Sequence, residues 1–191
     1  MLHGAWTAQA AHTLSTQIDS NRFDVLCAHR DNRSPIARKS RVRLGQIVCW
    51  MGFEFDASSR LSFPDVAVVD RASGKAVLLV EVEESKAPPK LVLADFFGML
   101  LGDCVTFGRS HEKLKIGEWT TSCVFVKSTG RGSGDQQLQS LVVRLDEARK
   151  QLTTPNKRIG RISIQAYRSE SDLCDRMSAQ TEEALRQLSG T

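Results

Sequence analysis

The chain has 191 residues, of which 41% are hydrophobic and 25% are charged, and its formal net charge is +4. This length and hydrophobic fraction allow one well-buried core, so we expect a single domain over residues 1–191. No apolar run is long enough to span a bilayer and no charged-then-apolar leader opens the chain, which excludes a membrane-spanning protein and predicts no membrane partner.

The first quarter of the chain is predicted to be helical. Apolar residues repeat at helical spacing at Trp6, Ala10, Leu14 and Ile18. Ser34-Pro35 is typical of a second helix start. The apolar stripe of this second helix would consist of Ile36, Leu44, Ile47, Val48 and Met51. Its polar side would carry the basic residues Arg38, Lys39, Arg41 and Arg43. Such a concentration of positive charge suits a polyanionic partner, so we expect these residues to bind nucleic acid.

Three strands, a helix and a further strand are expected next. Residues 53–56 alternate weakly, a β-branched run follows Asp65, and residues 76–83 form a second run after a short turn. Pro88-Pro89 ends the extended structure and opens a helix. The buried side of that helix is predicted to consist of Leu91, Ala94, Phe97 or Gly98, and Leu101. Residues 119–127 are rich in β-branched and aromatic residues, which is typical of a strand.

The last third is predicted to contain a helix, a strand and a closing helix. A glycine-rich loop over residues 130–134 leads to a helix with apolar positions between 138 and 152. Residues 161–167 alternate as a strand, and apolar spacing predicts a helix from about 173 to 188. The result is an α/β chain with an N-terminal helical extension over 1–34, a core over 35–127 and an α-β-α part over 128–191.

Three carboxylates stand at the ends of two predicted strands. Asp65 opens one run, while Glu81 and Glu83 interrupt the next. Alternate side chains of a strand share a face, so Glu81 and Glu83 point the same way, and an antiparallel neighbour can bring Asp65 beside them. Such a cluster repels itself unless a cation lies within it. We therefore predict that these three residues form a Mg²⁺ site, for which Mn²⁺ can substitute, because hard cations prefer oxygen ligands.

Pro64-Asp65, a sixteen-residue step to Glu81, and then Glu81-x-Glu83 resemble the motif of the PD-(D/E)xK nuclease superfamily. The resemblance implies a restriction-endonuclease-like fold, with a three-layer αβββαβ core and a mixed central sheet flanked by helices. It also implies a Mg²⁺-dependent endonuclease that hydrolyses DNA, with Asp65 and Glu81 as metal ligands. Glu83 stands where the family commonly has Lys, as an acidic residue does in some type II restriction enzymes. Lys86 could then supply a positive charge to catalysis, and Lys90 could contact phosphate.

The resemblance leaves two other functions open. A nuclease-derived domain that has lost catalysis could bind DNA or a partner protein. Alternatively, an interaction domain could oligomerise through its helical ends without binding nucleic acid. If both strands of a duplex are cut, we expect a homodimer, because one such site cuts one strand at a time and restriction enzymes offer the analogy.

Other chemistries have little support in the sequence. The four histidines lack the spacing of a zinc site, and the glycines at 130–134 match neither the dinucleotide-binding nor the Walker pattern. The five cysteines form no C-x-x-C pair and mostly lie in apolar stretches, where reduced thiols pack as small hydrophobes, so we expect a cytoplasmic protein. Asp70 is expected to serve its turn, and Glu84 to face solvent.

Overall fold

The computed structural model describes residues 4–30, 41–53, 55–84, 89–128 and 160–189, together with residues 136, 140, 141, 143–145 and 147. Its helices are α1 (Ala5–Gln17), α2 (Pro89–Leu100) and α4 (Glu170–Ser189), and the described residues between 136 and 147 are also helical. The strands are β1 (Phe23–Cys27), β2 (Val42–Leu44), β3 (Ile47–Trp50), β4 (Arg60–Ser62), β5 (Val66–Asp70), β6 (Lys75–Glu83), β7 (Cys104–Phe107), β8 (Glu112–Leu114), β9 (Thr121–Lys127) and β10 (Arg161–Tyr167).

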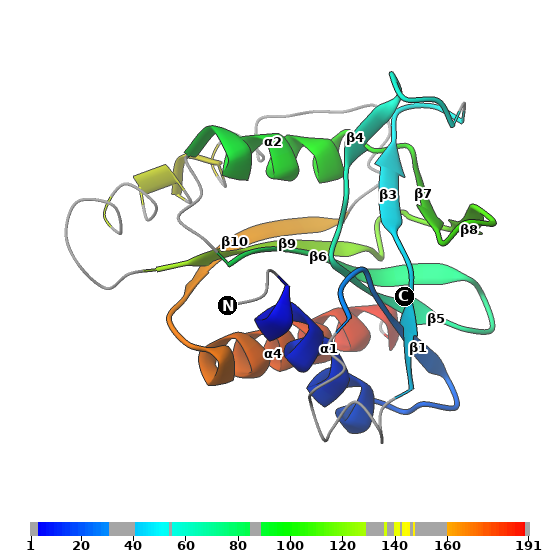
Figure 1. The fold of residues 1–191 in the computed structure, drawn as a ribbon, viewed down its shortest axis with the longest axis horizontal. Helices are drawn as coiled ribbons and strands as arrows, with labels where there is room; N and C mark the ends of the chain where they lie inside the picture. Colours follow the sequence, from blue (N-terminus) through cyan, green and yellow to red (C-terminus); the bar gives the residue numbers. More distant parts are fainter. Residues whose placement is uncertain are drawn as a thin grey trace.

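A mixed six-stranded sheet forms the centre of the fold, in the order β10-β9-β6-β5-β1-β2 (Figure 1). β5 is antiparallel to both β1 and β6, whereas β9 is parallel to both β6 and β10. The predicted α/β class is confirmed. Through the middle of this sheet the chain passes in the order α1, β1, β5, β6, α2 and β9. β2, β3 and β4 are inserted between β1 and β5, and β7 and β8 are inserted between α2 and β9.

Helices cover both faces of this sheet, with α2 on one side and α1 and α4 on the other (Figure 1). Successive residues of β6 separate into two cores. Leu79 packs in the cluster that contains Val92 and Phe96 of α2. Val80 and Val82 instead pack in the cluster that contains residues of α1 and α4. Because strand side chains alternate, Glu81 and Glu83 lie on the face of the sheet that α2 covers.

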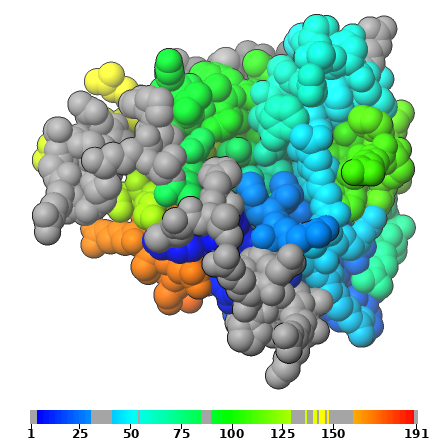
Figure 2. Space-filling model, viewed as in Figure 1, coloured from blue at the N-terminus to red at the C-terminus, as the bar shows by residue number. Residues whose placement is uncertain are grey.

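A second, antiparallel sheet has the order β4-β3-β7-β8 and was not predicted. All four residues of β3 are buried. In the space-filling view, α2 (green) and the segment from β3 to β4 (cyan) lie side by side (Figure 2). The contact is close, because a Cβ atom on Gly98 would stand 2.8 Å from the carbonyl oxygen of Leu61 in β4. A glycine at position 98 therefore allows α2 to dock against this sheet as well.

The helix predicted from position 35 to Met51 is wrong over its described part. Residues 42–44 and 47–50 are strands, residues 31–40 lie outside the described part of the chain, and Leu44 and Met51 are exposed rather than buried on one side. The strand predicted over residues 53–56 is also wrong in its described residues. There, Asp56 Oδ1 accepts hydrogen bonds from the backbone N–H groups of Ser58 and Ser59, which makes a turn before β4.

The buried side predicted for α2 is largely wrong. Leu91, Phe97 and Leu101 are 45%, 37% and 52% exposed. The side chains that enter the core are Val92, Phe96 and Met99. This helix is apolar on nearly all sides, so hydrophobic spacing alone does not determine which side faces the sheet.

The remaining predicted elements are found where the sequence places them. α1, α2, β5, β6, β9, β10 and α4 match their predicted segments, whereas β1, β4, β7 and β8 were missed. The predicted role of Asp70 in its turn is confirmed, because Asp70 Oδ1 accepts hydrogen bonds from the N–H groups of Ala72 and Ser73. The glycine-rich loop over 130–134 lies outside the described residues. In the part of the chain that is described, no helix combines the length and the apolar character needed to cross a membrane.

Candidate acidic site

Asp65 lies next to Glu81 across two neighbouring strands. The register pairs Val66 of β5 with Val80 of β6, so the next position along brings Asp65 beside Glu81. The backbone N–H of Asp65 donates to the Val80 carbonyl at 2.7 Å. In return, Asp65 Oδ2 accepts a 2.8 Å hydrogen bond from the N–H of Val82. The backbone of β6 thus holds the Asp65 carboxylate at the strand end.

The carboxyl group of Glu81 is buried next to other carboxylates. Among the described residues, Glu81 Oε2 is shielded from solvent and has no hydrogen-bond partner. Burial raises the pKa of Glu81 well above its usual range, and repulsion from Asp65, Asp95 and Glu83 raises this pKa further. An ionised Glu81 therefore needs a positive charge nearby, and no described residue donates a hydrogen bond to its Oε2.

Asp95 is a fourth carboxylate of this group, and it was not predicted. It enters from α2, on the turn that also carries the buried Val92 and Phe96. Asp95 Oδ2 is buried and, within the described part of the chain, has no hydrogen-bond partner. Burial, followed by repulsion from Glu83 and a hydrogen bond with it, raises the pKa of Asp95 to about 7. The sequence signal was present, because Asp95 lies three residues from Val92 and four from Met99.

His29 also reaches the site, directly after the missed strand β1. Its Nε2 lies 2.5 Å from Asp65 Oδ1, and this hydrogen bond raises the pKa of His29. The first turn of α1 packs against the same ring. Gly4 has a φ of +78°, and a Cβ atom there would stand 2.2 Å from His29 Nδ1, so only glycine suits this position.

Side chains from several elements join at the edge of the site. The prediction that Glu84 faces solvent is wrong. Its carboxylate accepts hydrogen bonds from the N–H and the hydroxyl of Thr7 in α1. The Tyr167 hydroxyl at the end of β10 donates to the Glu83 carbonyl at 3.1 Å. Lys127, at the end of β9, places its Nζ 3.6 Å from the centre of the Trp6 ring. The acidic group therefore lies at the carboxyl ends of parallel strands, where α/β sheets commonly bind ligands.

The predicted basic residues are not gathered around the carboxylates by any contact in the described part of the chain. Arg38, Lys39 and Lys86 lie outside the described residues. Arg41 is exposed just before β2, and Lys90 is exposed in the first turn of α2. Arg41 and Arg43, which were predicted to lie on one side of a second helix, lie before and in strand β2 instead.

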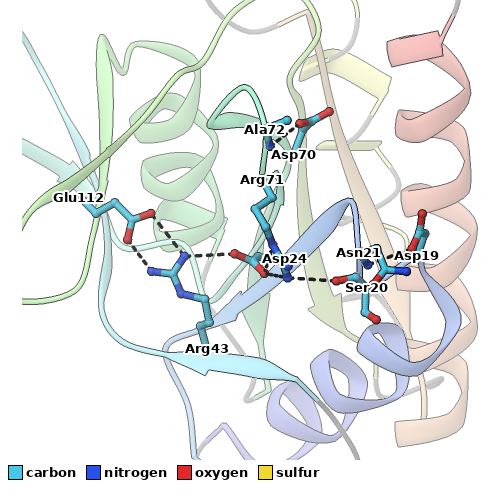
Figure 3. A network of polar contacts seen from close by, with 9 residues as sticks. All are labelled: Asp19, Ser20, Asn21, Asp24, Arg43, Asp70, Arg71, Ala72 and Glu112. Atoms are coloured by element: carbon cyan, nitrogen blue, oxygen red, sulfur yellow. Dashed lines mark hydrogen bonds and ion pairs between the residues drawn. The ribbon is translucent and has the colours of Figure 1, made fainter.

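Arg43 contacts carboxylates of the protein itself. It binds Asp24 of β1 and Glu112 of β8, and Asp24 also binds Arg71 (Figure 3). These acidic partners offset the positive charge of Arg43. A phosphate group would therefore compete with Asp24 and Glu112 for this guanidinium.

The donor chemistry of the acidic site fits a hard divalent cation. Four carboxylates supply only oxygen ligands, and two of their oxygens are buried without hydrogen bonds among the described residues. As the side chains stand, no three Asp, Glu, His or Cys residues of the described ranges form a group that could hold a metal ion. Ligation would require the carboxylates to turn toward one another, and Asp65 Oδ1 to turn from His29.

Comparison of the chain with protein-family models, with curated proteins and with solved structures finds no significant match.

Proposed function

We propose that this chain is a metal-dependent nuclease that hydrolyses phosphodiester bonds in DNA. The observation that carries the proposal is the pair of buried, unpartnered carboxylate oxygens, Glu81 Oε2 and Asp95 Oδ2, in the described acidic site. Like charges so close to one another are destabilising unless they are protonated or neutralised. A divalent cation bound by Asp65, Glu81 and Glu83 would neutralise them near pH 7.

The arrangement of elements supports a restriction-endonuclease-like fold. The order α1, β1, β5, β6, α2 and β9 has the αβββαβ pattern that the sequence motif implies. Asp65 and Glu81 also lie on adjacent antiparallel strands, as the motif requires of its two acidic ligands. The pattern uses β1 as its first strand, in place of the strand expected over residues 53–56.

Each acidic residue has a distinct part in the proposed reaction. Bound at this site, Mg²⁺ would lower the pKa of a water molecule and stabilise charge on the phosphate oxygens. Asp65 and Glu81 are the proposed ligands, with Asp65 held in place by the Val82 N–H. Glu83 is proposed to bind the metal or to orient the attacking water.

The proposed contacts with DNA come from the basic residues that the sequence suggests. Lys86 and Lys90 would contact phosphate, and the basic segment containing Arg38, Lys39, Arg41 and Arg43 would hold the sugar-phosphate backbone. A homodimer would let two such sites cut both strands of a duplex.

A cleavage assay tests the proposal directly. Plasmid, linear and single-stranded DNA are incubated with Mg²⁺ or Mn²⁺, and with EDTA as the metal-free control. We expect metal-dependent cutting by the wild type and its loss in Asp65→Asn. The matched control is Asp172→Asn, which removes a partly exposed carboxylate of α4 that pairs with Arg176.

Two other outcomes would redirect the proposal. If the folded wild type binds DNA but cuts none of the substrates, the inactive nuclease-derived binding domain becomes the better description. If it neither cuts nor shows a salt-dependent affinity for DNA, the interaction domain without nucleic acid is favoured.

A further inference from the structure

The helix that covers the acidic site contributes one carboxylate of its own. Asp95 is the one described carboxylate of the site that comes from outside the sheet, and its Oδ2 is buried without a partner among the described residues. Glu81 Oε2 is likewise buried without a hydrogen-bond partner among the described residues. Asp95 and Glu81 also repel each other. A cation reached by both carboxylates would satisfy the two oxygens and remove this repulsion.

We propose that Asp95 is a ligand of the divalent cation, so that the ion joins α2 to the strand ends of β5 and β6. This inference rests on the proposed metal site and adds a ligand that the sequence motif does not contain. The ligand class is a hard divalent ion such as Mg²⁺ or Mn²⁺, because the oxygens are carboxylates.

The position of Asp95 is set by packing and does not depend on its hydrogen bond with Glu83. Val92, Phe96 and Met99 fix the inner side of α2 in the core. Gly98 brings the helix backbone close to Leu61 of β4. A helix anchored on two sheets presents Asp95 at a defined place, which is what a metal ligand requires.

A purely structural role makes a different prediction. If Asp95 only hydrogen-bonds Glu83, an asparagine can replace it, since its amide donates a hydrogen bond to a carboxylate. Metal affinity would then stay the same. If Asp95 is a ligand, Asp95→Asn replaces an anionic oxygen by a neutral one and weakens binding.

Mn²⁺ binding, followed by electron paramagnetic resonance of the free ion and by calorimetry, separates the two roles. We expect one or more Mn²⁺ to bind the wild type, with the affinity reduced about tenfold or more in Asp95→Asn, equivalent to about 1.4 kcal/mol. Asp172→Asn should bind as the wild type does. Circular dichroism confirms that each variant is folded.

A second variant tests contact with the ion even if Asp95→Asn folds poorly. Asp95→Cys replaces the carboxylate by a thiolate, which favours Cd²⁺ over Mn²⁺. We expect a sulfur-to-Cd²⁺ charge-transfer band in this variant beyond that of the wild type, whose own five cysteines serve as the reference.

The outcomes distinguish this inference from the proposed function. Wild-type binding that is lost in Asp65→Asn but unchanged in Asp95→Asn, with no added Cd²⁺ band, overturns the role of Asp95 and leaves the metal site standing. No Mn²⁺ binding by the folded wild type overturns both.

Discussion

Four carboxylates share the space between the end of β6 and α2, and their mutual repulsion affects the stability of the folded chain. The effect is clearest at Asp95, because burial and Glu83 raise its pKa from 3.8 to about 7. Between these two pH values the folded chain keeps a proton that the unfolded chain releases. Stability therefore falls as pH rises, since the unfolded state binds fewer protons in this range.

This proton predicts a pH dependence that one substitution removes. Without divalent ions, the free energy of unfolding of the wild type should decrease from about pH 4 to about pH 7. Asp95→Asn cannot ionise, so its decrease should be smaller by about 2 kcal/mol, allowing for solvent screening. Urea unfolding in EDTA at several pH values measures both curves. Parallel curves for the two proteins would mean that Asp95 titrates at its ordinary pKa.

Residue positions on the strands could be predicted from the sequence, whereas contacts from other elements could not. Alternation along one strand suffices to put Glu81 and Glu83 on one face, and a short turn suffices to bring Asp65 alongside. The contact between His29 and Asp65 requires strand β1, which the sequence did not reveal. Asp95 reaches the site only because of the side on which α2 packs.

At the scale of elements, α2 shows why apolar spacing was ambiguous. One apolar set (Val92, Phe96 and Met99) enters the core, and another (Leu91, Phe97 and Leu101) remains exposed. Both sets have helical spacing, so the choice between them depends on tertiary contacts. Gly98 and the buried Asp95 mark the inner side, since a close approach to β4 and a site carboxylate both belong there.

The two faces of α2 should differ sharply in their effect on stability. Phe96 is 2% exposed, so Phe96→Ala should lower the free energy of unfolding by about 3–5 kcal/mol through the cavity that it leaves. Leu91 is 45% exposed, so Leu91→Ala should change it by only about 0.5 kcal/mol. Chemical denaturation measures both values. Similar losses in the two variants would show that the outer side of α2 is covered in solution.

The strands β2 and β3 were mistaken for a helix because their partners lie outside the segment itself. β2 pairs with β1, whereas β3 pairs both with the nearby β4 and with β7, which is more than 50 residues further along. Ile47–Trp50 is a short apolar run, and such a run reads equally well as a strand or as part of a helix. Periodicity within a window cannot detect partners that lie outside it.

At the scale of the whole molecule, charged residues attract one another across the two sheets at one place and repel one another at the acidic site. Arg43 of the six-stranded sheet binds Glu112 of the four-stranded sheet, so charges of opposite sign join them (Figure 3). The acidic site collects four charges of the same sign where β5, β6 and α2 meet. The first arrangement contributes little, because both side chains are more than 40% exposed. At the acidic site, the stability of the fold depends in part on whether protons or a cation neutralise the carboxylates.

A divalent ion at the acidic site should therefore stabilise the entire fold. Only the folded chain assembles Asp65, Glu81, Glu83 and Asp95, so an ion that binds them favours the native state. At about a hundredfold excess over the dissociation constant, the gain is about 2.7 kcal/mol. For a chain of this size, that gain corresponds to a Tm increase of about 5–10 °C.

Thermal unfolding in Mg²⁺, compared with EDTA and with NaCl of equal ionic strength, measures the increase. The increase should exceed that in NaCl, because general screening acts on all charges whereas ligation acts on one site. Asp65→Asn should lose the difference, and Asp172→Asn should keep it. An equal increase in all three proteins would assign the effect to screening, and the carboxylates would then be neutralised by protons rather than by a metal ion.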